Sequence, residues 1–121
     1  MIQPLNDENY PLLLTQDGPL VLYKHSHRCP ISAGAQRRLR TFALEHPAVP
    51  VYEVNVIDQR DLSQQIAADF GIDHQSPQAF LLQRGRVVWH DSHGAITGGA
   101  VEDALADLDG ADLDGADRVG A

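Results

Sequence analysis

Runs of apolar residues predict two strands in the first half of the chain. Residues 19–23 are almost entirely apolar and follow Gly18, a pattern typical of a central strand that is buried on both faces. Residues 51–57 are rich in β-branched side chains and alternate between apolar and polar positions. This alternation leaves one face of the second strand in contact with water, so it predicts a strand at the edge of the sheet.

Apolar residues spaced three to four positions apart predict two long helices. The first runs from Pro30 to about Glu45, and Pro30 suits the first helical position because a proline lacks the N–H group that is unused there. The second runs over 61–70, where Asp61 and Gln64 resemble a capping box. The other predicted elements are a short helix within 6–16 capped by Asn6 or Asp7, a hairpin of strands 78–83 and 86–90 around Arg84-Gly85, and a last helix capped by Thr97.

The order of these elements is β-α-β-α-β-β-α, with the optional N-terminal helix in front. A β-α-β unit requires two parallel strands joined by a right-handed crossover, and the closing hairpin adds two antiparallel strands. The sequence therefore predicts an α/β fold, in which a four-stranded mixed sheet is flanked by helices on both faces. This is the thioredoxin-like arrangement, which defines a fold class and leaves the function open.

The 121 residues have room for one small domain, and their charge is unevenly distributed. The chain carries a net charge of −8, of which −6 falls in residues 102–121. We expect one folded domain over 1–108 and a mobile acidic tail over 109–121, where the pentapeptide LDGAD begins at 108 and is repeated at once. This repeat lacks the spacing of a calcium-binding loop. An acidic chain without a long apolar segment or a secretory signal is expected in the cytoplasm, and we expect no binding to nucleic acid or membranes.

One cysteine, Cys29, stands between the first predicted strand and the first long helix. A single cysteine excludes an intramolecular disulfide. At the N-terminus of a helix, free N–H groups and the helix dipole stabilise a thiolate and lower the pKa of the thiol. The polar run from Lys24 to Arg28 adds positive charge before Cys29, whereas a cysteine used for packing would stand in an apolar segment. We therefore predict that Cys29 is a reactive nucleophile.

The tetrapeptide Cys29-Pro30-Ile31-Ser32 has the spacing of a C-x-x-C redox motif, with serine in place of the second cysteine. Ser32 cannot resolve a mixed disulfide by internal attack, so the thiol of a second molecule must do so. A hydrogen bond from Ser32 to the thiolate would lower the pKa of Cys29 further. The motif predicts a monothiol exchange protein with Cys29 and Ser32 in its catalytic centre.

The dipeptide Ser76-Pro77 precedes the first strand of the predicted hairpin. Proline is tolerated at the start of a strand, and X–Pro bonds are where cis peptides occur. In thioredoxin-like folds, a cis-proline at this point faces the active thiol, and the backbone before it pairs with an extended substrate. The sequence alone leaves open whether this proline is cis or an ordinary trans residue at a loop edge.

Three other functions fit parts of the sequence. His25, His27 and Cys29 form an H-x-H-x-C pattern that could bind zinc on one face of a straight strand, but the turn into the helix should separate Cys29 from the histidines. We therefore predict no bound metal. A catalytically silent thioredoxin-fold adaptor would use the acidic tail to bind a partner. Reduction of peroxide or arsenate would need a second cysteine or a different anion-binding loop.

Three segments together resemble the monothiol bacilliredoxin family. They are KHSHRCPIS at 24–32, the segment 58–71 followed by HQSPQ at 74–78, and RVVWH with the SH and IT that follow it within 86–97. The resemblance covers about residues 10–106. It implies a thioredoxin-like protein that removes bacillithiol from S-bacillithiolated proteins under oxidative stress, with bacillithiol as co-substrate and no bound cofactor.

The same resemblance implies roles for individual residues. Cys29 would be the nucleophile that takes over bacillithiol, Ser32 would stand at the resolving position, and Ser76-Pro77 would form the edge on which the substrate docks. The partners would be S-bacillithiolated client proteins and a low-molecular-weight thiol. Bacillithiol carries a malate with two carboxylates, so its site should offer cations and free N–H groups. The candidates for substrate binding are His27, Arg28, Pro30, Ser76, Pro77, His93 and Gly98.

Overall fold

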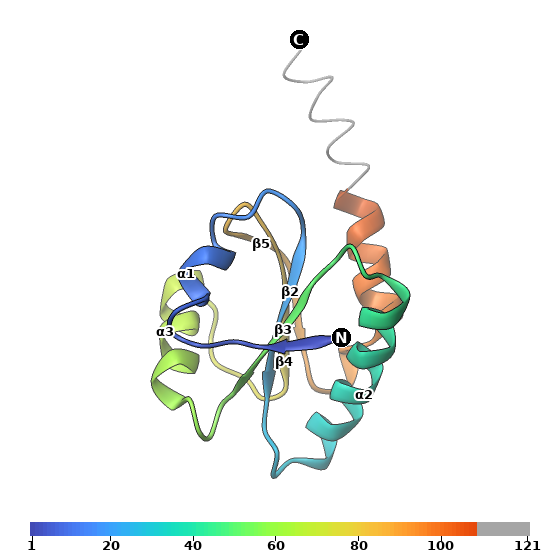
Figure 1. The fold of residues 1–121 in the computed structure, drawn as a ribbon. Helices are drawn as coiled ribbons and strands as arrows, with labels where there is room; N and C mark the ends of the chain where they lie inside the picture. Colours follow the sequence, from blue (N-terminus) through green and yellow to red (C-terminus); the bar gives the residue numbers. More distant parts are fainter. Residues whose placement is uncertain (109–121) are drawn as a thin grey trace.

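A five-stranded sheet with helices on both faces forms the structure, a computed structural model that describes residues 1–108 (Figure 1). The predicted acidic tail over 109–121 lies outside the described residues. The strands are β1 (Ile2–Pro4), β2 (Leu20–His25), β3 (Val51–Asn55), β4 (Gln78–Gln83) and β5 (Arg86–Ser92). Their order across the sheet is β1-β3-β2-β4-β5. β1, β3 and β2 are parallel, whereas β4 runs antiparallel to β2 and to β5.

The strand β1 corrects two predictions, because it adds a fifth strand and moves β3 away from the edge of the sheet. β1 pairs with β3 from Ile2 opposite Val51 to Pro4 opposite Glu53. Three residues that include a proline carry no recognisable period, so the sequence alone did not reveal this strand. The polar face of β3 is also covered, since the carboxylate of Glu53 accepts a hydrogen bond of 2.7 Å from the side-chain amide of Gln36.

The described helices are α1 (Tyr10–Leu13), α2 (Pro30–Glu45), α3 (Arg60–Phe70), a 3-10 turn η1 (His93–Ala95) and a C-terminal helix over 98–108. In Figure 1, α1 and α3 cover one face of the sheet, and α2 and the C-terminal helix cover the other. Within residues 1–108, no helix combines the length and the apolar character needed to cross a membrane.

The predicted start of α3 differs from the structure. The helix α3 begins at Arg60 and has no side-chain cap, so the predicted capping box of Asp61 and Gln64 is wrong. The preceding Gln59 instead connects the end of β3 to the residue after β1, because its Oε1 accepts from the Asn55 N–H at 3.0 Å and its Nε2 donates to the Leu5 carbonyl at 2.7 Å.

The N-terminal helix is shorter than predicted, whereas the predicted N-cap of the C-terminal helix is confirmed. Only Tyr10–Leu13 are helical within 6–16, because the Oδ1 of Asn6 accepts from the N–H groups of Glu8 and Asn9 and forms a turn there. The Oγ1 of Thr97 accepts from the N–H of Ala100 at 3.0 Å, as expected for the cap of the last helix.

Alternate residues of β2 enter two separate hydrophobic cores. Val21 and Tyr23 pack under α2 and the C-terminal helix, whereas Leu20 and Leu22 pack under α1 and α3. All four side chains are almost completely buried. The prediction of a central strand that is covered on both faces is therefore confirmed.

One charged side chain, Lys24, interrupts the apolar sequence of β2 and is completely buried. Its Nζ donates to the Ser63 carbonyl at 2.9 Å and lies 3.1 Å from Nδ1 of His74. The ammonium group also lies 5.9 Å from the centroid of the Phe80 ring. Burial removes water from the ammonium group and lowers the pKa of Lys24 to about 8.

The turn between β4 and β5 has the two left-handed residues expected of a two-residue hairpin. The φ angles are 55° at Arg84 and 76° at Gly85. The turn packs on the loop before β2, since the Arg84 N–H donates to the Gln16 carbonyl at 3.2 Å. A Cβ atom at Gly85 would lie 2.6 Å from the carbonyl oxygen of Leu14.

We predict that Gly85→Ala lowers the free energy of unfolding by at least about 2 kcal/mol, because the left-handed φ angle and the close Leu14 carbonyl both oppose a side chain. Urea unfolding measures the change. The control is Gly18→Ala, whose new Cβ would meet nothing within 4 Å and should change stability by less than about 0.5 kcal/mol. Equal stability of the two variants would contradict the prediction.

We predict that stability rises with pH above 8 because of Lys24. The folded state releases its proton near pH 8, whereas the unfolded state holds it to about pH 10.4, so the unfolded state binds more protons in between. This difference amounts to about 1 kcal/mol between pH 8 and 9. Urea unfolding should be measured in a Cys29→Ser background, so that no thiol titrates in this range.

The matched variant for this measurement is Lys24→Met, again in the Cys29→Ser background. Methionine keeps the length of the side chain and has no proton to release, so the rise between pH 8 and 9 should disappear. An identical pH dependence with lysine and with methionine at this position would show that another group causes it.

Candidate functional site

The single thiol lies where β2 has ended and α2 begins, at the lower end of the view in Figure 1. Cys29 is the N-cap residue of α2, with an extended backbone (φ −109°, ψ 118°), and Pro30 opens the first turn. The Cys29 N–H donates to the Ser26 carbonyl at 3.1 Å, and the Cys29 carbonyl accepts from the Ala33 N–H at 3.2 Å. The side chain is free and partly exposed.

The first turn of α2 lowers the pKa of the Cys29 thiol. The largest contribution is the backbone N–H of Ser32, and the N–H of Ile31 and the hydroxyl of Ser32 add to it. Partial burial of the sulfur acts in the opposite direction and is outweighed. These N–H groups have no carbonyl partner within the helix, so they are free to stabilise the thiolate.

Ser32 also connects the first turn of α2 to the strand before it. Its side chain is fully buried, and its Oγ accepts from the Ser26 N–H at 3.3 Å. Its carbonyl accepts a hydrogen bond of 2.8 Å from the hydroxyl of Tyr23. A serine at this position can therefore fix the turn around Cys29, although it cannot form a disulfide.

A buried pair of Tyr23 and His25 lies behind this turn, and the sequence analysis did not include it in the site. The Tyr23 hydroxyl lies 2.9 Å from Nδ1 of His25. Because the hydroxyl donates to Ser32, the histidine is the donor in this contact. Burial lowers the pKa of His25 and raises that of Tyr23, so both groups are neutral near pH 7. The one available signal was a tyrosine among the aliphatic residues of β2.

His27 and Arg28 are exposed in the loop before Cys29. Nδ1 of His27 lies 2.9 Å from the side-chain amide nitrogen of Asn55, at the end of β3. His25 and His27 are thus directed to different partners, and the structure does not gather His25, His27 and Cys29 into one set of metal ligands. Positive charge beside the thiol comes from Arg28.

The peptide bond between Ser76 and Pro77 is cis, which decides the alternative that the sequence left open. β4 begins directly after Pro77, and Gln78 lies opposite Lys24 of β2, so the dipeptide lies at the same end of the sheet as Cys29. The side chain of Gln78 holds this loop through the Gln75 N–H and the Asp73 carbonyl. Within residues 1–108, the buried Oγ of Ser76 has no hydrogen-bond partner.

The structure brings His93 to this loop and places Gly98 elsewhere. The His93 N–H donates to the Pro77 carbonyl at 3.0 Å, and the imidazole is exposed. A Cβ atom at Gly98 would lie 3.8 Å from Cβ of Phe42 in α2. Phe42 is twelve residues beyond Pro30, which is about 18 Å along the helix axis. Gly98 is therefore not part of the surface around Cys29.

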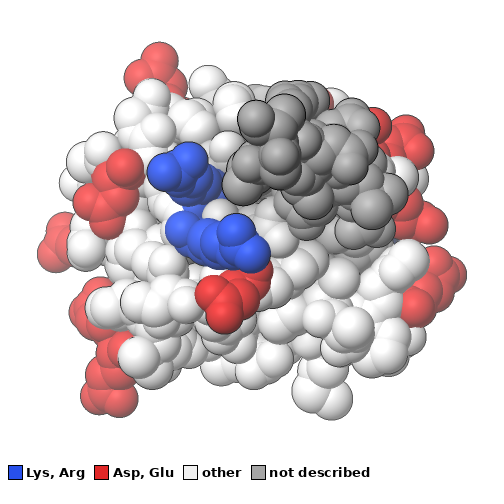
Figure 2. Space-filling view, turned by 90° about the horizontal axis from the view of Figure 1, so that it is seen from above, with Lys and Arg blue, Asp and Glu red and all other residues white. Residues whose placement is uncertain are grey.

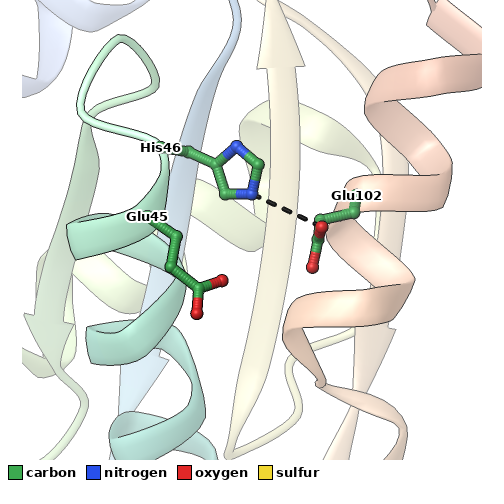
Figure 3. Close-up of side chains that lie close together, drawn as sticks. All are labelled: Glu45, His46 and Glu102. Atoms are coloured by element: carbon green, nitrogen blue, oxygen red, sulfur yellow. Dashed lines mark ion pairs between the residues drawn. The ribbon is translucent and has the colours of Figure 1, made fainter.

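A group of three potential metal ligands lies at the far end of α2 (Figure 3). Glu45, His46 and Glu102 bring one ligand atom each within 4.8 Å of one another, and no other such group occurs in residues 1–108. Nε2 of His46 lies 3.5 Å from a carboxylate oxygen of Glu102, and the imidazole stacks on Phe42. All three side chains reach water, so we interpret the group as an ion pair that joins α2 to the C-terminal helix.

Acidic side chains predominate at the end of the molecule that lies opposite to Cys29. Figure 2 shows the end opposite to Cys29, where acidic side chains lie around the margin and basic side chains form one small patch. The whole chain has 17 acidic residues and 9 lysines and arginines. The exposed Arg28 is thus a positive charge next to Cys29 in the sequence of an acidic protein.

Comparison with known proteins identifies the family and the fold. The family described as "Monothiol bacilliredoxin BrxC" matches residues 6–101. A solved protein with a thioredoxin fold is 31% identical, with a TM-score of 0.79 over 86% of this chain and 93% of its own. Thioredoxin from Trypanosoma brucei brucei is 16% identical, with a TM-score of 0.75 over 89% and 90%, and shows the fold alone. The protein has the thioredoxin fold and belongs to the monothiol bacilliredoxin family of thiol oxidoreductases.

Proposed function

We propose that the protein removes bacillithiol from S-bacillithiolated proteins through a mixed disulfide on Cys29. The observation that carries the proposal is a partly exposed thiol with a lowered pKa, followed three residues later by a buried serine where a dithiol enzyme has its second cysteine. Membership of the monothiol bacilliredoxin family supports bacillithiol as the thiol that is exchanged.

In the first step, the Cys29 thiolate attacks the bacillithiol sulfur of the mixed disulfide on the client protein. A new disulfide forms between Cys29 and bacillithiol, the old disulfide breaks, and the client thiolate leaves and takes up a proton. In the second step, the thiolate of another small molecule attacks the bound bacillithiol sulfur and releases Cys29. Electrons balance in each step, because one disulfide is exchanged for another.

The cis-proline loop and the residues around Cys29 would form the docking surface for the client. The backbone at Ser76 and Pro77, just before β4, would form the edge on which the client docks. Pro30, His27 and Arg28 would contact the substrate on the other side of the sulfur. His93 is fixed to Pro77 through its N–H, so its imidazole would line the same surface. The exchange requires reduced thiols, so we place it in the cytoplasm.

Nothing in the described residues favours the adaptor alternative. That alternative depended on the acidic tail, which lies outside residues 1–108. A thiol whose pKa is lowered by a helix N-terminus is instead suited to exchange chemistry.

The direct test is intact-mass analysis after wild type is mixed with an S-bacillithiolated protein. We expect one bacillithiol adduct on the wild type, together with release of the free client thiol, because Cys29 is the only cysteine in the chain. The Cys29→Ser variant should form no adduct and release no client thiol. Absence of the adduct on wild type, or equally fast exchange with a glutathionylated client, would contradict the assignment to bacillithiol.

A second prediction concerns the pKa of Cys29. Ser32→Ala removes one hydrogen-bond donor to the sulfur and keeps the backbone N–H groups of Ile31 and Ser32. The midpoint of the pH profile for iodoacetamide alkylation should therefore move to higher pH and stay below that of an ordinary cysteine. Ser26→Ala removes a hydroxyl from the same loop and should leave the midpoint in place. A profile unchanged by Ser32→Ala would exclude its hydroxyl as a donor to the thiolate.

A further inference from the structure

A buried polar cluster beneath the cis-proline loop has no part in the exchange at the sulfur. Lys24 is completely buried, Ser63 is 1% exposed, and both contact His74, which lies at the surface two residues before Ser76. A buried ammonium group is costly unless its donors are paired, and here a carbonyl and an imidazole accept from it. The cluster connects β2, α3 and the loop before β4.

The buried lysine determines which nitrogen of His74 carries the proton. The ammonium group of Lys24 can only donate, so Nδ1 of His74, 3.1 Å away, must accept. The hydroxyl of Ser63 lies 3.3 Å from the same Nδ1. The neutral imidazole therefore carries its proton on Nε2, and burial together with the charge of Lys24 lowers the pKa of His74, which maintains the neutral form. Within residues 1–108, this Nε2–H has no hydrogen-bond partner.

A hollow of about 360 Å³ opens beside His74, and its polar lining includes the guanidinium of Arg60. It is lined by Val56, Ile57, Arg60, Ser63, Gln64 and His74. Arg60 is exposed and forms no ion pair within residues 1–108. Asp58 and Asp61 line the neighbouring hollow on the other side of Arg60, and neither carboxylate comes within the 4.0 Å of an ion pair. The hollow has room for a small polar group and presents a guanidinium beside an imidazole N–H.

The hollow lies at the same end of the sheet as the thiol, on the opposite face. Val56 continues from β3, and its N–H donates to the His25 carbonyl at the end of β2, four residues before Cys29. His74 leads into Ser76-Pro77, and the Pro77 carbonyl accepts from the N–H of His93 at 3.0 Å. A ligand that contacts both the sulfur and the hollow would have to cross the end of the sheet beside Pro77.

We propose that this hollow binds the carboxylate end of the small thiol whose sulfur is exchanged at Cys29, with Arg60 and Nε2–H of His74 as its donors. The inference rests on the proposed function and names the residues that would select its thiol. A guanidinium can bind a carboxylate through two parallel hydrogen bonds, and a neutral imidazole with a fixed proton adds a third without a change of protonation. Lys24 is a positioning residue, because it acts through the orientation of His74.

The test compares two mixed disulfides of one client protein, one with bacillithiol and one with 2-mercaptoethanol, which has no carboxylate. Release of the client thiol is followed in single turnovers with the bacilliredoxin in excess. With the bacillithiol substrate, we expect Arg60→Gln to raise about tenfold the protein concentration that gives half of the maximal rate. This is the effect expected for loss of a charge-assisted hydrogen bond. The maximal rate, and both constants for the 2-mercaptoethanol substrate, should stay unchanged.

The matched control is Arg86→Gln, an exposed arginine at the start of β5, which should behave as wild type with both substrates. Arg60 is preferred over His74 as the site of substitution because loss of His74 would also remove a partner of the buried Lys24. Arg60→Gln should leave the 2-mercaptoethanol substrate unaffected, which also serves as the check that this variant is folded and active.

Three results would overturn the inference. The first is an equal rise of the half-saturating protein concentration with both substrates in Arg60→Gln, which would mean that Arg60 binds a carboxylate of the client protein. The second is no loss with either, and the third is a selective loss in His93→Ala with none in Arg60→Gln. Failure of the proposed function looks different, since wild type itself would then form no bacillithiol adduct on Cys29.

Discussion

The thiolate of Cys29 depends on backbone N–H groups that helix α2 cannot use for itself. The first turn of any helix leaves such donors without carbonyl partners, and here the sulfur of the N-cap residue lies against those of Ile31 and Ser32. The rest of the structure holds this turn in place. The carbonyl of Ser32 is bound by Tyr23, its hydroxyl by the backbone of Ser26, and both partners belong to β2 or the loop that follows it.

Two consecutive residues of β2 place polar groups on opposite faces of the sheet. Tyr23 points toward α2 and supports the turn that carries the thiol, whereas Lys24 points toward α3 and fixes the proton on His74. Side chains alternate between faces along a strand, so one strand can serve both sides of the site. The reacting sulfur and the donors in the hollow are thereby held by the same rigid, buried element.

The features that sequence analysis identified correctly have local causes. Pro30 at the first helical position, the left-handed turn at Arg84-Gly85 and the cap at Thr97 each depend on residues only a few positions apart. The features that it missed join distant segments. β1 becomes a strand only because β3 lies beside it, and Lys24 meets Ser63 and His74 across 39 and 50 positions.

The sequence by itself determined that this protein has one thiol and where that thiol stands relative to a helix. It also determined that no second thiol of the same chain can resolve a mixed disulfide on Cys29. Those properties follow from residue identity and from hydrogen bonds within one turn. Only the tertiary structure decided that Pro77 is cis, that Gly98 lies away from the sulfur and that a buried lysine orients His74. Burial decides these features, because a polar group that loses water must find its partner wherever the fold supplies one.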